Sequence, residues 1–206
     1  MTHTTTLIDL IRHGEPEGGL KFRGSLDDPL SDKGWQQMES AVTPEDHWQV
    51  IVSSPMVRCR RFAEKLAGER QIPLHVDEGL REIGFGDWEG LTAEQVQQRY
   101  GDHLDRFWQD SVNFIPPRGE AVTAFYQRVT QSFSHWQQQL AGQRVLVVCH
   151  GGVIRMVLAE ILGIPLAKSF TGFAVPYACR SRIQVDRSAH GEFRSLLSHY
   201  PPASDR

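Results

Sequence analysis

The chain has 206 residues, with 25 acidic and 22 basic side chains and a formal net charge of −3. This balance argues against a nucleic-acid or anionic-membrane partner, since either leaves a basic footprint in the sequence. Hydrophobic residues make up 40% of the chain, which is ordinary for a globular protein, and the length fits one domain, residues 1–206.

The three cysteines, Cys59, Cys149 and Cys179, are too few and too widely spaced for a disulfide framework or a zinc site. We expect three reduced thiols. The first ten residues carry no basic segment and only a short apolar run, so they predict neither a signal peptide nor a membrane span. A cytoplasmic location is therefore expected.

The first part of the chain alternates strand and helix patterns. In chain order these are strand 7–11, helix 31–42, strand 50–53, a helix from 55 to about 68 and strand 72–76. Ser54 and Pro55 are typical of an N-cap and a first helical position, and they set the predicted start of the second helix.

The middle of the chain reads differently. Thr92 and Gln95 form a capping-box pattern for a short helix ending at Tyr100. Residues 102–117 are rich in aromatic side chains and end in Pro-Pro. We interpret this stretch as part of an aromatic-rich excursion, at about residues 85–118, that lies over the domain and contributes no core element.

The last part returns to alternation, with helix 120–140, strand 144–149, helix 152–162 and strands near 178–185 and 193–197. Strands alternating with helices predict an α/β fold: a three-layer sandwich whose mostly parallel central sheet has helices on both faces.

Polar residues follow the predicted strands where each one ends. In sheets of this kind ligands bind outside the carboxyl ends of the strands. The residues expected to meet at that edge are Arg12 and His13, Arg58, Glu82, and His150 and Gly151.

This set suits phosphate chemistry. Arginine forks match phosphate oxygens, and Arg58, in the first turn of a helix, gains nothing from the helix dipole unless an anion is bound. The Gly151-Gly152 pair opens another helix with free N–H groups. An imidazole such as His13 can attack phosphorus directly, and Glu82 is placed to protonate the leaving alkoxide.

Each residue also has a structural alternative. His13 can be merely structural or exposed, and His150 can be a hydrogen-bonded core histidine. Arg58, beside Arg60 and Arg61, can belong to a solvated helix face. Glu82 can pair with Arg81. The joint placement at successive strand ends favours the functional interpretation.

Four blocks resemble the histidine phosphatase superfamily, also called phosphoglycerate-mutase-like: residues 10–15, 53–59, 80–90 and 147–152. The resemblance implies the phosphoglycerate-mutase-like fold. It also implies His13 as the phosphorylated nucleophile and Glu82 as the proton donor. Arg12, Arg58, His150 and the backbone of Gly151 are then the phosphate ligands. No metal and no cofactor are expected, and the partner is a small-molecule phosphate monoester.

The loop after His13 departs from the family pattern. Many members have Thr or Ser where this chain has Pro16, and many have a phosphate-contacting Asn where it has the stretch 17–19. Gly19 can offer only its backbone N–H, so Arg23 or Ser25 is a candidate compensating donor.

Residues 22–30 and 114–120 resemble the α-ribazole-5′-phosphate phosphatase branch, which acts in cobalamin nucleotide-loop assembly. Open alternatives are a broader phosphatase of sugar or nucleotide phosphates, a mutase-like enzyme and a non-catalytic phosphate-binding module. The excursion's aromatic side chains can stack on a benzimidazole or form a satellite core: Phe85, Trp88, Phe107, Trp108 and Phe114. The oligomeric state stays open.

Overall fold

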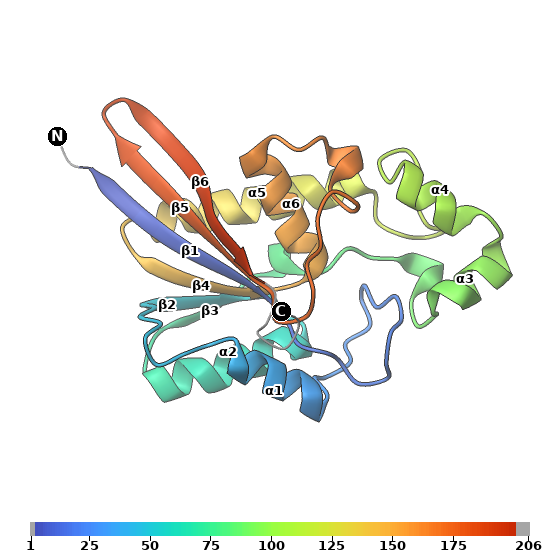
Figure 1. Ribbon diagram of the computed structural model, residues 1–206, viewed down its shortest axis with the longest axis horizontal. Coiled ribbons are helices and arrows are strands. Elements are labelled where there is room, and N and C mark those ends of the chain that lie inside the picture. The colour runs from blue at the N-terminus through green and yellow to red at the C-terminus, as the bar shows by residue number, and fades with distance from the viewer. Residues whose placement is uncertain (1–2, 201–206) are drawn as a thin grey trace.

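A computed structural model describes residues 3–200 of the chain. Its centre is a six-stranded sheet in the order β3-β2-β4-β1-β5-β6 (Figure 1). The strands are β1 (Thr4–Arg12), β2 (Val50–Ser53), β3 (Leu74–Val76), β4 (Arg144–Cys149), β5 (Arg180–Ser188) and β6 (Gly191–Tyr200). β1 to β4 run parallel, whereas β5 and β6 are antiparallel additions at one side. The predicted mostly parallel sheet is confirmed.

Helices cover both faces of the sheet, as predicted. One face packs on α1 (Asp32–Ser40) and α2 (Val57–Arg70), and the other on α5 (Val122–Gln139) and α6 (Gly151–Leu162) (Figure 1). Side chains alternate between the two cores along β1, since Leu10 points to the α5/α6 side and Ile11 to the α1/α2 side. This alternation produces the three-layer α/β sandwich.

The stretch 102–117 is not the core-free excursion that the sequence suggested. It contains α4 (His103–Gln109), which follows α3 (Ala93–Tyr100) away from the sheet (Figure 1). Phe107 is fully buried and belongs to the same apolar cluster as the sheet's α5/α6 face, as does Trp88. The prediction failed because α4 has only seven residues, too few for a helical period to show.

Helix starts were predicted with mixed success. The capping box of α3 is confirmed, because Thr92 accepts from the N–H of Gln95 and the Gln95 side chain accepts from the N–H of Thr92. The predicted N-cap Ser54 is wrong: α2 begins at Val57, with Met56 as its cap residue. The Ser54 hydroxyl instead contacts the ring of His150, 2.7 Å away.

Candidate active site

A pocket of about 210 Å³ lies at the carboxyl ends of the parallel strands. Arg12 is the last residue of β1 and His13 follows it, Arg58 lies in the first turn of α2, Glu82 follows the 3₁₀ turn Glu78–Leu80, and Gly151 opens α6. All five line the pocket. The fold therefore brings these five residues together as the strand ends predicted, whereas His150, the sixth residue expected there, is fully buried and not among the lining residues.

His13 is held in one orientation. Its Nδ1 lies 2.7 Å from the carbonyl oxygen of Gly14, and since a carbonyl only accepts, Nδ1 carries the proton. The Nε2 atom is then left with its lone pair. Burial, followed by the charges of Arg12 and Arg58, holds the pKa of His13 well below its ordinary value. The ring is thus neutral at neutral pH, which is the state a nucleophile needs.

Arg12 and Arg58 each use only some of their N–H donors for hydrogen bonds to the protein. Arg12 donates to the carbonyl of Val175 at 2.7 Å and lies 4.1 Å from the ring of Tyr177. Arg58 donates to the carbonyls of Leu26 and Gly24 at 2.7 and 3.2 Å. Within the described residues, 3–200, the Nε atom of each is buried and has no hydrogen-bond partner.

Neither Arg12 nor Arg58 makes an ion pair with a carboxylate within residues 3–200. Burial is the main reason why the pKa of Arg12 is lowered. Arg58 is only 1% exposed, so its alternative reading as part of a solvated helix face is wrong. A buried guanidinium and a half-buried one, neither of them in an ion pair within the described residues, call for an anion between them.

His150 lies behind this pair. Its ring is fully buried and meets the ring of His13 edge-on, with centroids 5.2 Å apart. Burial and the charge of Arg58 hold the pKa of His150 well below its ordinary value. Its contact with Ser54 fixes the ring, so His150 combines a packing role with a position next to His13.

Glu82 faces the same pocket through contacts with two backbone N–H groups. Its Oε2 accepts from Gly152 and its Oε1 from Ile83, each at 3.1 Å. A Cβ on Gly152 would lie 2.2 Å from Oε1, so glycine there is what lets the carboxyl group come so close. The alternative pairing with Arg81 is wrong, because Arg81 pairs with Glu78.

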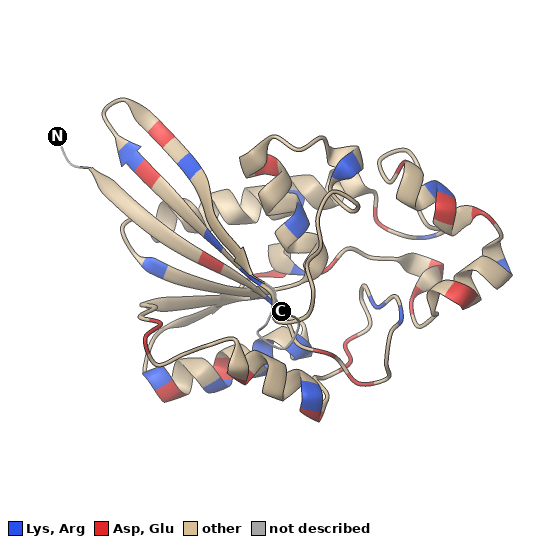
Figure 2. Ribbon diagram, in the orientation of Figure 1, with Lys and Arg blue, Asp and Glu red and all other residues tan. Residues whose placement is uncertain are grey.

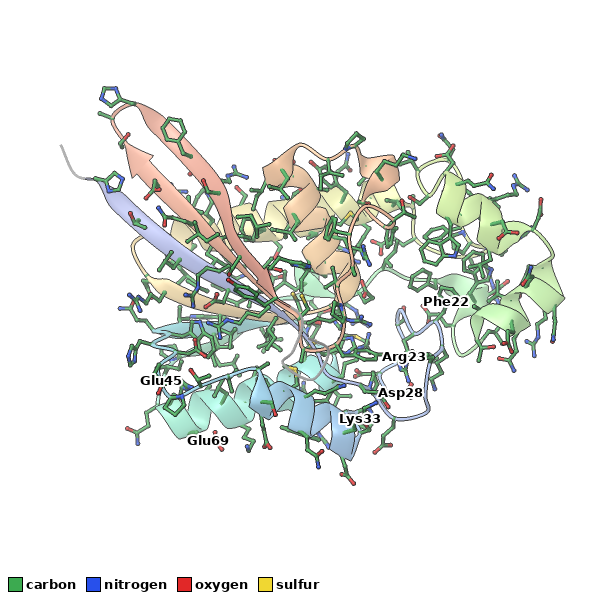
Figure 3. All side chains as sticks on the ribbon, viewed as in Figure 1. Phe22, Arg23, Asp28, Lys33, Glu45 and Glu69 are labelled. Atoms are coloured by element: carbon green, nitrogen blue, oxygen red, sulfur yellow. The ribbon has the colours of Figure 1, made fainter. Side chains whose placement is uncertain are left out.

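The loop between β1 and α1 folds around Arg23 (Figure 3). This guanidinium donates to Asp28 at 3.0 Å and to the carbonyls of Glu17 and Gly19 at 2.6 and 2.7 Å. Arg23 also lines the pocket, whereas Gly19 and Ser25 are not among its lining residues. Ser25 is exposed and donates its N–H to Glu89.

Three further polar side chains that line the pocket were not predicted: Lys21, Arg155 and Tyr177. Arg155 could have been found, since it lies four residues after Gly151 and shares its helix face. Lys21 and Tyr177 lie in loops with no periodic pattern. Lys21 pairs with Asp28 at 2.8 Å.

The two buried neutral histidines predict a pH-dependent stability. Below pH 6.5 the unfolded chain protonates them, while the folded chain does not until the lower folded pKa values of His13 and His150 are reached. Stability should fall as the pH drops through this window, by about 1.4 kcal/mol per pH unit for each histidine. Urea unfolding at several pH values between 5.5 and 7.5 gives the free energy of unfolding as a function of pH. This free energy should depend less steeply on pH in H13N than in the wild type. Equal slopes would contradict the assignment.

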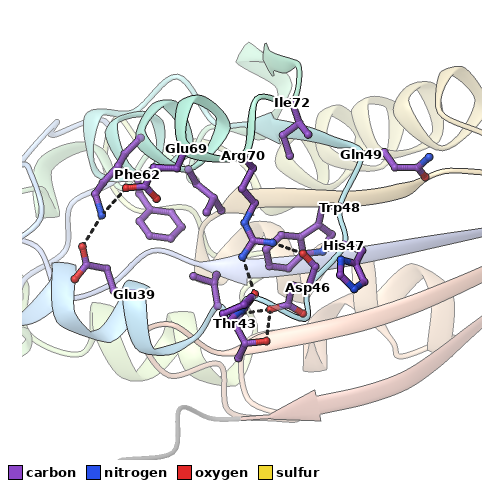
Figure 4. Close-up of a pocket in the computed structure, with 14 residues that line it drawn as sticks. Glu39, Thr43, Asp46, His47, Trp48, Gln49, Phe62, Glu69, Arg70 and Ile72 are labelled. Carbon is purple, nitrogen blue, oxygen red and sulfur yellow. Dashed lines mark hydrogen bonds and ion pairs between the residues drawn. The ribbon is translucent and has the colours of Figure 1, made fainter.

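A second, larger depression of about 680 Å³ lies at the amino ends of β2 and β3 (Figure 4). Its arginine, Arg70, donates to the backbone carbonyls of Thr43 and Asp46 and stacks on Trp48, so it is committed to holding this loop. Acidic and basic residues alternate along the neighbouring helices α1 and α2 (Figure 2). Among the described residues, none that lines this depression carries an unpaired buried donor like those of Arg12 and Arg58.

Within residues 3–200 no helix is long and apolar enough to cross a bilayer. No group of three or more His, Cys, Asp or Glu side chains in the same range is arranged to hold a metal ion.

The fold and this pocket define a class: α/β proteins that hold an anion beside a neutral histidine at the sheet's carboxyl edge. The family model of the Histidine phosphatase superfamily (branch 1) matches residues 8–195, and the chain belongs to that superfamily. The protein is accordingly a phosphoric monoester hydrolase, and the phosphoglycerate-mutase-like fold expected from the sequence is confirmed.

The chain is similar in sequence and structure to several phosphatases. The chain is 29% identical to the adenosylcobalamin/α-ribazole phosphatase of Escherichia coli strain K12 over 86% of this chain and 89% of that one. It is 28% identical to phosphoserine phosphatase 1 of Hydrogenobacter thermophilus over 86% and 85%. The structure of Bacillus stearothermophilus YhfR superposes with a TM-score of 0.84 at 29% identity, covering 93% of this chain and 95% of that one.

Proposed function

We propose that the protein hydrolyses phosphate monoesters through a phosphohistidine at His13. The observation that carries this proposal is the neutral ring of His13 beside the guanidinium groups of Arg12 and Arg58, whose buried Nε–H donors have no hydrogen-bond partner within residues 3–200. In the first step the Nε2 lone pair attacks phosphorus and the P–O ester bond breaks. Arg12, Arg58, His150 and the N–H of Gly151 bind the phosphoryl oxygens as charge builds up.

Glu82 completes both half-reactions. As a carboxylic acid it gives its proton to the leaving alkoxide. As a carboxylate it then takes a proton from water, whose oxygen attacks the phosphohistidine and releases inorganic phosphate and neutral His13. Every proton in this cycle passes through Glu82, so the scheme needs no metal ion and no cofactor.

We further propose α-ribazole 5′-phosphate as the substrate and the cytoplasm as the location. Phe22, Phe85, Trp108 and Tyr177 line the pocket and offer aromatic faces to a benzimidazole base. Of the excursion's aromatic residues, Trp88 and Phe107 are fully buried in the apolar cluster on the α5/α6 face of the sheet, so they do not face the substrate. The E. coli relative, named for this substrate, gives the proposal its second support.

A specific observation favours a second candidate. Lys21 and Arg155 add cationic side chains to the pocket beyond the two arginines beside His13. A substrate with a second anionic group, such as phosphoserine or a phosphoglycerate, would use them. The Hydrogenobacter relative is named for such a substrate.

A kinetic screen separates these candidates. We expect kcat/KM for α-ribazole 5′-phosphate to exceed that for phosphoserine and for sugar phosphates by at least about 10-fold, since stacking a base on an aromatic ring contributes about 1–3 kcal/mol. W108L should remove most of this preference, and F193L, on an exposed site of β6, should leave it intact. A preference for phosphoserine, or none, would overturn the substrate assignment and leave the phosphatase chemistry standing.

A further inference from the structure

The segment that carries Glu82 has no regular structure of its own, since it joins two 3₁₀ turns, Glu78–Leu80 and Gly86–Trp88. Its shape is set by one side chain from α5. The guanidinium of Arg128 donates to the carbonyl oxygens of Gly79, Arg81 and Glu82 at 3.1, 2.9 and 3.3 Å. Three of the four peptide carbonyls from Gly79 to Glu82 are thus tied to a single rigid group.

Glu120 extends these contacts to the other side of Glu82, and we call Arg128 and Glu120 together the clasp. Its carboxylate binds Arg128 in a bidentate pair, with distances of 3.0 and 2.7 Å. The same carboxylate accepts from the N–H of Gly84 at 3.2 Å, and the N–H of Glu120 donates to the carbonyl of Gly84 at 2.8 Å. The backbone is therefore held both before and after Glu82.

We propose that Arg128, with Glu120, is a positioning residue that keeps the Glu82 carboxyl group within reach of the leaving oxygen. The inference rests on the proposed role of Glu82 as the proton donor. Among the described residues, the carboxyl group itself is hydrogen-bonded only to the N–H groups of Gly152 and Ile83, so its location depends on where the backbone carries it. A displacement of about 1 Å at a reacting group can cost about 100-fold in rate.

Geometry, not charge, is what the clasp supplies. Arg128 and Glu120 neutralise each other, and both are about one-quarter exposed, so the pair adds little net field at Glu82. Lysine keeps the positive charge of Arg128 but has no planar fork, and it cannot bind Glu120 and three carbonyls together. R128K therefore removes the clasp without leaving an unpaired charge.

The test uses two substrates that differ in their need for a proton. An alkoxide leaving from glycerol 2-phosphate must be protonated, whereas p-nitrophenolate leaves from p-nitrophenyl phosphate without help. General acid catalysis contributes about 100-fold to 10,000-fold, so partial loss of alignment in R128K should lower kcat on glycerol 2-phosphate by about 10-fold to 100-fold. On p-nitrophenyl phosphate kcat should change by less than about 3-fold, because nucleophile and phosphate ligands stay in place.

Four further variants complete the design. R128Q/E120Q removes the ion pair as a neutral unit and should show the same selectivity. R194K, at a similarly exposed arginine that pairs with Glu192 on β6, should match the wild type on both substrates. E82Q sets the benchmark for a missing acid, and adding R128K to it should cost less than about 2-fold more, since coupled residues are not additive.

The outcomes are distinct. The inference is supported if R128K lowers kcat on glycerol 2-phosphate but not on p-nitrophenyl phosphate, and if this effect disappears in the E82Q background. Equal losses on both substrates in R128K, with E82Q still selective, would show a purely structural role and overturn the inference alone. If E82Q itself lost both activities equally, the acid assignment in the proposed function would fail, and the positioning role would fail with it.

Discussion

Replacing His13 with alanine is expected to lower kcat by about 10,000-fold or more, because removing a nucleophile leaves only the binding groups to act. The loss should be the same for good and poor leaving groups, which separates it from loss of the acid. Isotopic phosphate from the substrate should label the wild-type chain through an acid-labile, base-stable bond, and it should not label H13A.

The matched control is H190A, at an exposed histidine in the turn between β5 and β6. It should retain wild-type activity and labelling. Activity of H13A within about 10-fold of the wild type would refute the nucleophile assignment, since loss of a covalent nucleophile is never so mild. A stable H13A that still binds phosphate but turns nothing over would also confirm that the chain is an enzyme and not a binding module.

The residues that meet at the carboxyl edge of the sheet were predictable because the strand topology fixes them. Once β1, β2 and β4 are read as parallel neighbours, the residues after them must meet, and Arg12, Arg58 and His150 do. The nature of the residues then narrows the chemistry to an anion. No side-chain detail is needed for that step.

Other parts of the site depend on contacts that no local pattern encodes. Tyr177 reaches Arg12 from a loop, and Arg128 lies on an amphipathic helix whose period predicts only its apolar face. Ser54 looked like a helix cap because its hydroxyl suits one, but it contacts His150 instead. In each case a tertiary partner, distant in sequence, decides what a polar group does.

The antiparallel strands show the same limit at the other side of the sheet. They were predicted near 178–185 and 193–197, whereas β5 reaches Ser188 and β6 runs from Gly191 to Tyr200. Arg187 and Glu192 lie outside the predicted bounds, and they form an ion pair across the hairpin at 2.6 Å. Polar side chains can pair in this way on neighbouring antiparallel strands, so polarity does not end the strand.

Arg58 shows the conflict between binding and stability in this pocket. Arg58 is 1% exposed, and within residues 3–200 its Nε has no hydrogen-bond partner and its guanidinium forms no ion pair. Removing one donor that stabilises a transition-state charge costs about 100-fold to 1,000-fold. We expect R58M to lower kcat/KM by that amount, on p-nitrophenyl phosphate as well as on alkyl esters, because the lost contact is with the phosphoryl group and not with the leaving oxygen.

The same substitution should not destabilise the free protein. A buried guanidinium without a carboxylate has an uncompensated desolvation cost, and methionine fills similar space without it. We expect the free energy of unfolding of R58M to equal that of the wild type or to exceed it by about 1 kcal/mol, since the lost bonds to the carbonyls of Gly24 and Leu26 offset part of the gain.

Ligand addition then reverses the order of stability. Inorganic phosphate should raise the Tm of the wild type, where it neutralises Arg12 and Arg58 together, and raise that of R58M much less. R61M, at a neighbouring exposed arginine on α2, should respond to phosphate as the wild type does. An R58M chain that is less stable than the wild type and gains as much from phosphate would mean that Arg58 supports the fold and not the anion.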